Sequence, residues 1–152
     1  MVARHRLCAG IPRNWKLNAG GVLYEDPALI ALVEDDDFHR VSVVRLMRSS
    51  GYAVADFSSA SAFLASPGLD RTRCLIADIH MPVMTGVDLF RRLKQTGRAI
   101  PTILITAYPD ETVRARALDD GVLCYLTKPF DDDELLRCVR MALGDEKSTS
   151  DN

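Results

Sequence analysis

The stretch LIALVEDDD at residues 29–37 holds the two patterns that decide the fold: a continuous aliphatic run and a block of acids directly behind it. An aliphatic run without polar alternation is typical of a strand buried on both faces of a parallel sheet. Four further short runs have the same character. We therefore predict five strands, all internal or nearly so, at Leu29–Val33, Ala53–Phe57, Cys74–Ala77, Thr102–Ile105 and Leu123–Leu126.

Amphipathic stretches with helical periodicity alternate with these strands, which predicts a doubly wound α/β fold with a five-stranded parallel sheet. In the first helix we expect one buried stripe made of Phe38, Val41, Val44 and Met47. The third helix should bury Leu89, Phe90 and Leu93. The predicted helices are Phe38–Ser50, Ser59–Ala65, Val87–Thr96, Glu111–Asp119 and a fifth from Asp131 to about Ala142.

Length and composition restrict the class of protein. The chain has 152 residues, 47% of them apolar and 26% charged, which corresponds to one globular domain with modest tails. Its net charge of -2 argues against a general nucleic-acid binder. The longest aliphatic run near the front, residues 28–33, is far shorter than the ~20 residues that cross a bilayer. We expect a soluble cytoplasmic protein.

Cysteine usage and the tails complete this outline. The four cysteines show no metal-binding or disulfide spacing, so we expect free thiols at Cys8, Cys74, Cys124 and Cys138. Residues 1–27 show neither strand nor helix periodicity and are expected to be a flexible leader. Residues 28–143 should form the domain, and residues 144–152 a disordered tail.

Polar residues follow the strands at the points where they end. Because the carboxyl ends of parallel strands meet at one edge of the sheet, Asp35 and Asp78 would face each other across the crevice if the strands were ordered 2-1-3-4-5. Neighbouring carboxylates repel by about 4 kcal/mol per pair at 4 Å for an effective dielectric near 20, so the cluster needs a cation. Mg²⁺, bound by one or two carboxylates and a phosphoryl oxygen, fits this requirement. Asp36 and Asp37 are alternative ligands, although both more naturally cap the first helix.

Four motifs in order, each closing a predicted strand, carry a resemblance to a known family. They are LVEDD at 32–36, DIHMP at 78–82 followed by Gly86, Thr106-Ala107, and KPF at 128–130. Together they resemble the receiver domain of two-component response regulators, the CheY-like fold, over about residues 28–143. The resemblance implies strand order 2-1-3-4-5, with five helices.

The resemblance also implies roles for individual residues. Asp78 would accept a phosphoryl group from a phosphohistidine on a sensor histidine kinase. Mg²⁺ would be bound by Asp35, Asp78 and the backbone carbonyl of His80, with Glu34 acting through metal-bound water. Many members of the family carry Asp where this chain has Glu34.

Further residues would respond to the phosphoryl group. Thr106 and Lys128 would hold its oxygens, and Tyr125 corresponds to the family's switch aromatic, although it could simply be a strand tyrosine whose hydroxyl needs a partner. His80 and Tyr108 would influence the lifetime of the aspartyl phosphate. The fourth helix, fifth strand and fifth helix would form the output surface and a possible dimer interface.

Several alternatives remain open at this point. Only nine residues follow Leu143, too few for a DNA-binding helix-turn-helix, so we expect a standalone regulator unless the chain is a fragment. It could signal to a downstream protein or relay phosphate to a histidine phosphotransfer protein. A receiver-like scaffold that never takes phosphate is a third possibility. A haloacid dehalogenase-type phosphatase is disfavoured, because His80 stands where that chemistry needs a second Asp. We expect a signalling domain rather than an enzyme.

Overall fold

Five parallel strands form one sheet in the computed structural model, which describes residues 15–25 and 28–144. The sheet has the order β4-β3-β5-β6-β7, which is the predicted order 2-1-3-4-5. Neighbouring strands of the sheet pair residue by residue. Val33, for example, pairs with Phe57 on one side and with Ala77 on the other. The strands are β3 (Leu29–Val33), β4 (Ala53–Phe57), β5 (Thr72–Asp78), β6 (Thr102–Thr106) and β7 (Cys124–Thr127).

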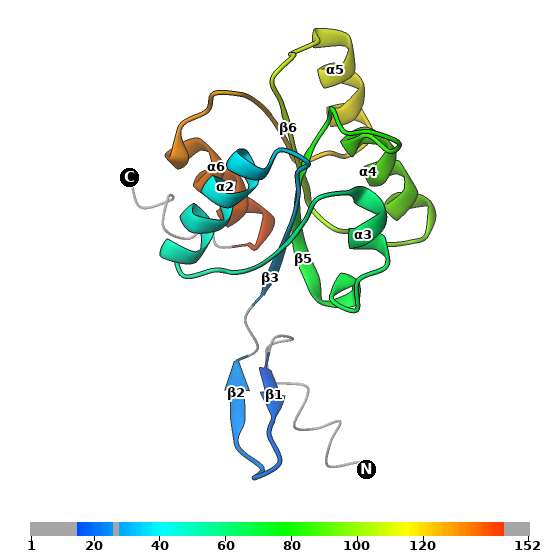
Figure 1. The fold of residues 1–152 in the computed structure, drawn as a ribbon. Helices are drawn as coiled ribbons and strands as arrows, with labels where there is room; N and C mark the ends of the chain where they lie inside the picture. Colours follow the sequence, from blue (N-terminus) through cyan, green and yellow to red (C-terminus); the bar gives the residue numbers. More distant parts are fainter. Residues whose placement is uncertain (1–14, 26–27, 145–152) are drawn as a thin grey trace.

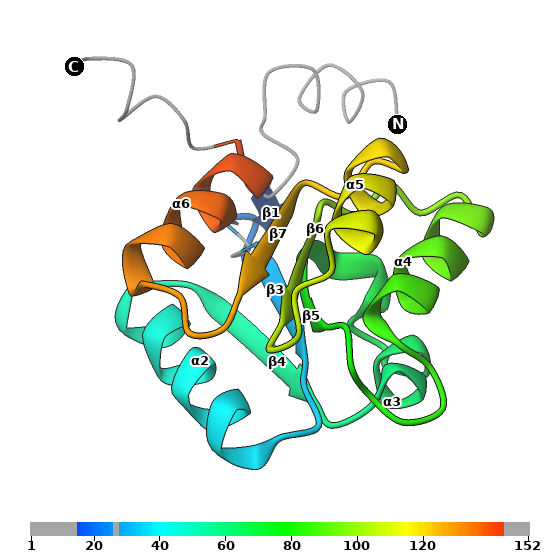
Figure 2. The same cartoon turned by 90° about the horizontal axis from the view of Figure 1, so that it is seen from above.

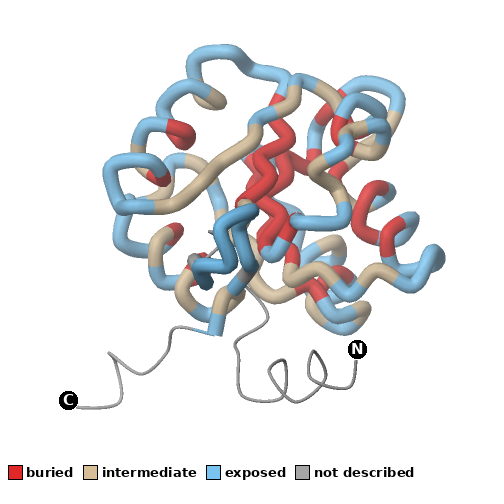
Figure 3. Tube along the Cα trace, turned by 90° about the horizontal axis from the view of Figure 1, so that it is seen from below, coloured by how far each residue is buried: buried red, intermediate tan, exposed pale blue. Residues whose placement is uncertain are grey.

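Helices cover both faces of this sheet (Figures 1 and 2). One face carries α2 (Asp37–Ser49) and α6 (Asp132–Ala142), and the other carries α3 (Ala60–Leu64), α4 (Gly86–Gln95) and α5 (Glu111–Asp119). A short 3-10 helix, Leu69–Arg71, precedes β5. The central strands are almost fully buried between these two layers (Figure 3). The predicted doubly wound fold with five helices is confirmed, and Leu89, Phe90 and Leu93 of α4 are buried as expected.

The expectation that all five strands are internal or nearly so overstates the burial of two of them. In β4 no residue is fully buried, and β7 is likewise only partly buried. Both are edge strands in the observed order, so each has a neighbour on one side only. A short aliphatic run cannot by itself distinguish an edge strand from a central one, because both carry one face into the core.

The buried stripe predicted for the first helix is also wrong in part. Val44 and Met47 are buried, but Phe38 and Val41 are 90% and 48% exposed. The third buried residue of α2 is Val43. At 3.6 residues per turn, Phe38 points almost opposite to the side shared by 43, 44 and 47, so the helix cannot bury both sets against one sheet.

A two-stranded hairpin precedes the domain, where we expected no regular structure. β1 (Trp15–Leu17) pairs antiparallel with β2 (Leu23–Glu25). The Asn18 side chain accepts hydrogen bonds from the Gly20 and Val22 N–H groups, and Gly21 has a φ of +77°. These are the turn signals of a hairpin, but strands of three residues are too short to show a period. The rest of the predicted leader, residues 1–14 and 26–27, and residues 145–152 of the predicted tail lie outside the described residues.

Within the described ranges, no helix is both long and apolar enough to cross a membrane.

Candidate functional site

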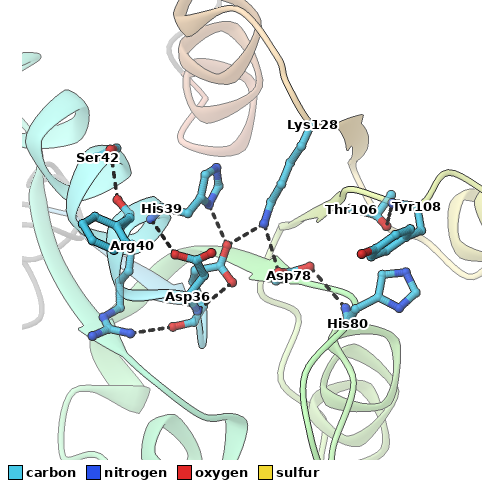
Figure 4. Close-up of polar contacts among 11 residues, drawn as sticks. Asp36, His39, Arg40, Ser42, Asp78, His80, Thr106, Tyr108 and Lys128 are labelled. Atoms are coloured by element: carbon cyan, nitrogen blue, oxygen red, sulfur yellow. Dashed lines mark hydrogen bonds and ion pairs between the residues drawn. The ribbon is translucent and has the colours of Figure 1, made fainter.

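The polar residues predicted to meet at the carboxyl edge of the sheet do meet there (Figure 4). Asp78 is the last residue of β5, Thr106 the last of β6, and Lys128 directly follows β7. Glu34 directly follows β3, the strand that pairs with β5. The parallel register of four strands therefore places side chains from distant parts of the chain at one site.

Asp78 lies at the centre and is only 7% exposed. Its Oδ2 accepts a hydrogen bond from Lys128 Nζ at 3.0 Å, and its Oδ1 accepts one from the His80 backbone N–H at 3.2 Å. Burial raises the pKa of Asp78, and the neighbouring Glu34 carboxylate raises it further, against the opposing effect of Lys128. The ionised form of this carboxylate is thus held at an energetic cost that a cation would relieve.

Glu34 is the most deeply buried acid of the site, at 1% exposure. Its Oε1 lies 2.7 Å from Lys128 Nζ and 2.6 Å from His39 Nδ1. Burial opposes ionisation of Glu34, but its hydrogen bonds with His39 and Lys128 and its interaction with the Asp78 carboxyl group outweigh it and hold the pKa well below the usual range. This carboxylate is therefore charged at neutral pH.

Lys128 joins the two buried acids. Its ammonium donates to Glu34 and Asp78 at the same time. Burial lowers the pKa of Lys128, but the two carboxylates more than compensate and raise it above the ordinary value. The amine is therefore a fixed positive charge and not a proton acceptor at neutral pH.

Three carboxylates of the site can hold a metal ion. Glu34, Asp35 and Asp78 each offer an oxygen, and these oxygens lie within 4.8 Å of one another. Asp35 is exposed, whereas the other two are buried. The ammonium of Lys128 offsets only one of these three carboxylates, so the group keeps a formal negative charge. Carboxylate oxygens are hard donors, which Mg²⁺ prefers as ligands. The residues present therefore fit the expected Mg²⁺ ion.

The other two acids of the block serve the adjacent helix. Asp36 is the N-cap of α2, and its side chain accepts a hydrogen bond from the His39 backbone N–H at 3.1 Å. Asp37 is the first residue of α2 and pairs with Arg40 at 2.6 Å. Both observations agree with the capping role, which we preferred to metal ligation.

Thr106 and the loop behind it form the other side of the site. Thr106 is fully buried, and its Oγ1 accepts a hydrogen bond from the Tyr108 backbone N–H at 2.9 Å. The rings of Tyr108 and His80 meet edge to face with centroids 5.2 Å apart. This aromatic contact links the loops that follow β5 and β6 and lies beside Asp78 (Figure 4).

Tyr125 lies in the middle of β7, partly buried against the core on the α4 and α5 side. Its hydroxyl accepts a hydrogen bond from the backbone N–H of Asp110 at 3.3 Å, and Asp110 is the N-cap of α5. The hydroxyl thus has the partner that a half-buried tyrosine needs. Through this bond Tyr125 is connected to the segment that begins at Thr106.

Two residues of the site were missed from the sequence. The His39 ring contacts the Glu34 carboxylate and meets Phe130 edge to face at 5.8 Å. Arg40 donates to the Glu34 carbonyl oxygen at 2.8 Å and to Asp56 at 3.1 Å. The signal that the sequence offered was their position. They follow Glu34 by five and six residues and lie in the first turn of the helix that begins next to the acids.

Comparison with known proteins agrees with this arrangement. The family model described as response regulator receiver domain matches residues 30–140. Response regulator protein TodT of Pseudomonas putida is 39% identical over 116 residues, which cover 76% of this chain and 51% of TodT. Nodulation protein W of Bradyrhizobium diazoefficiens is 36% identical over 126 residues, covering 83% of this chain and 56% of that protein. The chain thus spans about half the length of the curated relatives that it matches.

Solved structures show the same fold. The crystal structure of FixJ-N is 31% identical and superimposes with a TM-score of 0.69, covering 76% of this chain and 93% of that one. A receiver protein from Burkholderia phymatum is 39% identical, with a TM-score of 0.66 and coverages of 76% and 94%. Chemotaxis protein CheY4 of Vibrio cholerae, at 24% identity and a TM-score of 0.70, covers 77% of this chain and 99% of its own and supports the fold alone.

Proposed function

The chain belongs to the receiver domains of two-component response regulators, and from that premise we propose that Asp78 accepts a phosphoryl group from a phosphohistidine on a sensor histidine kinase. The observation that carries the proposal is the position of the Asp78 carboxylate. It is buried, touches an ammonium 3.0 Å away, and shares its surroundings with Glu34 and Asp35.

The transfer is a nucleophilic substitution at phosphorus. An Asp78 carboxylate oxygen forms the new P–O bond while the P–N bond to the donor histidine breaks, and the electron pair of that bond stays on the imidazole nitrogen. Lys128 and the Thr106 hydroxyl would hold the phosphoryl oxygens on which this charge develops. The protein contributes positioning and charge neutralisation, since Lys128 remains protonated and no side chain needs to act as a base.

Mg²⁺ would be held by Asp35, Asp78 and the backbone carbonyl of His80, with Glu34 acting through water. When bound, the ion supplies positive charge that offsets the carboxylates and the incoming phosphoryl oxygens. The low pKa of Glu34 keeps that acid ionised for this purpose. The shape of the site depends on His39 and Lys128, which fix the Glu34 carboxylate from two sides.

An apolar groove beside Lys128 offers a surface for the phosphodonor protein. Val43 and Leu46 of α2 and Phe130 of the loop before α6 line it, together with His39 and Pro129, and its volume is about 370 Å³. An amphipathic helix that carries the phosphohistidine can lay its apolar side in this groove and bring the phosphoryl group to Asp78. We assign the kinase to this face.

Phosphorylation would then change partner binding through Thr106 and Tyr125. If the Thr106 hydroxyl turns to the phosphoryl group, the Tyr108 N–H loses its acceptor and the loop that leads to Asp110 is released to move. The affected surface is α5, β7 and α6. Because a ligand shifts only an equilibrium between states that it binds differently, the phosphoryl group must bind more tightly in the active arrangement.

Phosphorylation by a small molecule tests the proposal directly. The purified chain, incubated with Mg²⁺ and either acetyl phosphate or phosphoramidate, should gain the mass of one phosphoryl group in an acid-stable, base-labile form. Asp78→Asn should gain none, whereas the exposed Asp133→Asn should behave like the unchanged chain. Removal of Mg²⁺ by chelation should abolish the adduct.

The contrary results are equally specific. Absence of an adduct in every condition would favour a receiver-like scaffold, and steady turnover of phosphate esters would favour a phosphatase.

For the groove, Leu46→Glu should slow transfer from a phosphorylated kinase and leave phosphoramidate labelling unchanged. For switching, partners captured with and without beryllofluoride, a phosphoryl mimic, should differ; an unchanged set would contradict a switch.

A further inference from the structure

His39 reaches the site from α2, although it is neither a phosphoryl contact nor a metal ligand in the proposed function. Its Nδ1 lies 2.6 Å from Glu34 Oε1. Because the Glu34 carboxylate is charged at neutral pH, it can only accept a hydrogen bond. The His39 ring must therefore carry a hydrogen on Nδ1 and donate it to Glu34.

The two oxygens of Glu34 are engaged unequally. Lys128 Nζ lies 2.7 Å from Oε1, the same oxygen that accepts from His39. These donors come from different elements, α2 and the segment after β7 (Figure 4). The other oxygen, Oε2, accepts a longer hydrogen bond, 3.4 Å, from the Asp36 backbone N–H. The strong donors thus share Oε1, and Oε2 is better able to accept a further hydrogen bond.

The main chain of Glu34 is fixed on both sides of its side chain. Its N–H donates to the Phe57 carbonyl at 3.0 Å, and its own carbonyl accepts from Arg40 at 2.8 Å. The freedom that remains lies in the side-chain torsions, and a glutamate has one more of these than an aspartate. Since Lys128 also donates to Asp78, His39 is the donor whose ring serves Glu34 alone among these contacts of the described residues.

The His39 ring is itself held in place. It meets Phe130 edge to face at 5.8 Å, and Phe130 follows Lys128 by two residues. The His39 backbone N–H donates to the Asp36 side chain at 3.1 Å, which ties this residue to the start of α2. A ring fixed by packing on one side and by a carboxylate on the other is suited to orient that carboxylate.

We propose that His39 is a positioning residue for the Mg²⁺ site: it holds Glu34 Oε1 and keeps Oε2 available to water beside the ion. This inference rests on the proposed function of the site. Partners that orient the groups around a metal change its affinity by about 10–100-fold when they are removed. Because Glu34 would act through water, we expect the lower end of this range, about tenfold weaker Mg²⁺ binding.

Calorimetric titration of the full chain with Mg²⁺ alone tests the role of His39. His39→Leu keeps much of the volume and removes the donor, so the Kd for Mg²⁺ should rise about tenfold. His39→Asn places an amide N–H close to the position of Nδ1 and should recover most of this loss. A mere packing role against Phe130 predicts the reverse order, with leucine tolerated and asparagine harmful. Phe38→Leu, an exposed neighbour on α2, is the control and should bind Mg²⁺ like the unchanged chain.

A double-mutant cycle asks whether His39 acts through Glu34. Glu34→Asp withdraws the carboxylate by one methylene group, out of reach of His39. In that background, His39→Leu should leave the Kd for Mg²⁺ unchanged, because residues that act as one unit give non-additive losses. The same loss in both backgrounds would overturn the proposal. If Glu34→Asp binds no Mg²⁺, the order of His39→Leu and His39→Asn decides.

A measurement without metal keeps the proposal falsifiable if His39→Leu does not fold, which urea unfolding checks. Long-range proton–nitrogen NMR of the unchanged chain should show a hydrogen on His39 Nδ1, and a ring hydrogen on Nε2 alone would overturn the proposal. Labelling by phosphoramidate separates the two levels of inference. If the unchanged chain binds no Mg²⁺ and takes no phosphoryl group, the proposed function fails and this inference with it. If it does both and His39→Leu binds Mg²⁺ equally well, only the role of His39 is overturned.

Discussion

Gly86 lies directly against the backbone of Asp78: a Cβ atom at position 86 would stand 2.5 Å from the Asp78 carbonyl oxygen. The Gly86 N–H also donates to the Ile79 carbonyl at 3.1 Å. The start of α4 and the end of β5 are thus packed so closely that position 86 has no room for a side chain. The Asp78 carboxylate is positioned by this close approach as well as by Lys128.

Gly86→Ala should therefore damage the site and the fold together. The extra methyl group must displace backbone, and we expect the free energy of unfolding to fall by about 1–3 kcal/mol, measured by urea titration. Labelling by acetyl phosphate should slow as well. Gly51→Ala is the control, because its φ of +91° makes alanine strained while its Cβ meets nothing within 4 Å. It should lose stability and keep the labelling rate; equal labelling by both variants would contradict the positioning role of Gly86.

Asp78→Asn should stabilise the protein at pH 7 when divalent cations are absent. The pKa of Asp78 in the folded chain is raised above its ordinary 3.8. Asp78 therefore contributes stability below pH 3.8, and this contribution is lost as the pH rises through the raised pKa. At pH 7 the ionised carboxylate is therefore unfavourable, and the neutral amide removes this cost. Thermal melts at pH 7 should show a higher Tm for the variant, and the difference should shrink as the pH approaches 3.8. A lower Tm at pH 7 would contradict this account.

Mg²⁺ should reverse the order of thermal stability between Asp78→Asn and the unchanged chain. An ion that binds only the folded chain stabilises it by about 2.7 kcal/mol at a hundred times its Kd. Asp78→Asn removes one of three clustered carboxylates, so its Tm should rise much less with added Mg²⁺ than that of the unchanged chain. Asp133→Asn, outside the cluster, should respond like the unchanged chain. Equal Mg²⁺ responses in all three proteins would place the ion elsewhere.

Thr106→Val tests the hydroxyl on the far side of the site. Valine keeps the shape of the buried side chain but leaves the Tyr108 N–H without its acceptor. Because Tyr108 is 71% exposed and this hydrogen bond is only partly buried, we expect a loss of about 0.5–1.5 kcal/mol. Thr106→Ser keeps the hydroxyl and should lose less. Urea unfolding and amide hydrogen exchange at Tyr108 measure the difference. If exchange at Tyr108 is the same in both variants, the hydrogen bond is not what holds this loop.

The fragment 28–143 should fold without the preceding hairpin. β1 and β2 contact chiefly each other, and Trp15, Leu17 and Leu23 are exposed. The Tm of the fragment should lie within about 2 °C of that of the full chain, a change that corresponds to less than 1 kcal/mol for a domain of this size. A fall of more than about 5 °C would show that the hairpin belongs to the domain.

The sequence by itself determined the elements and most of the site. Each aliphatic run, such as Leu29–Val33, became a strand, because a short uninterrupted apolar run between helical segments is typical of a strand buried on both faces of a parallel sheet. Asp36 and Asp131 marked helix starts through local hydrogen-bonding rules that involve only neighbouring residues. Asp78, Thr106 and Lys128 could be selected because each comes where a strand ends.

Only the tertiary structure decided which of these residues touch. Lys128 reaches Glu34 across 94 residues and Asp78 across 50, and His39 turns its ring to the same carboxylate from α2. The buried side of α2 and the only partial burial of β4 and β7 were likewise not predictable. Each depends on how helices and strands are placed against one another, and a periodic pattern describes a segment without stating which neighbour it meets.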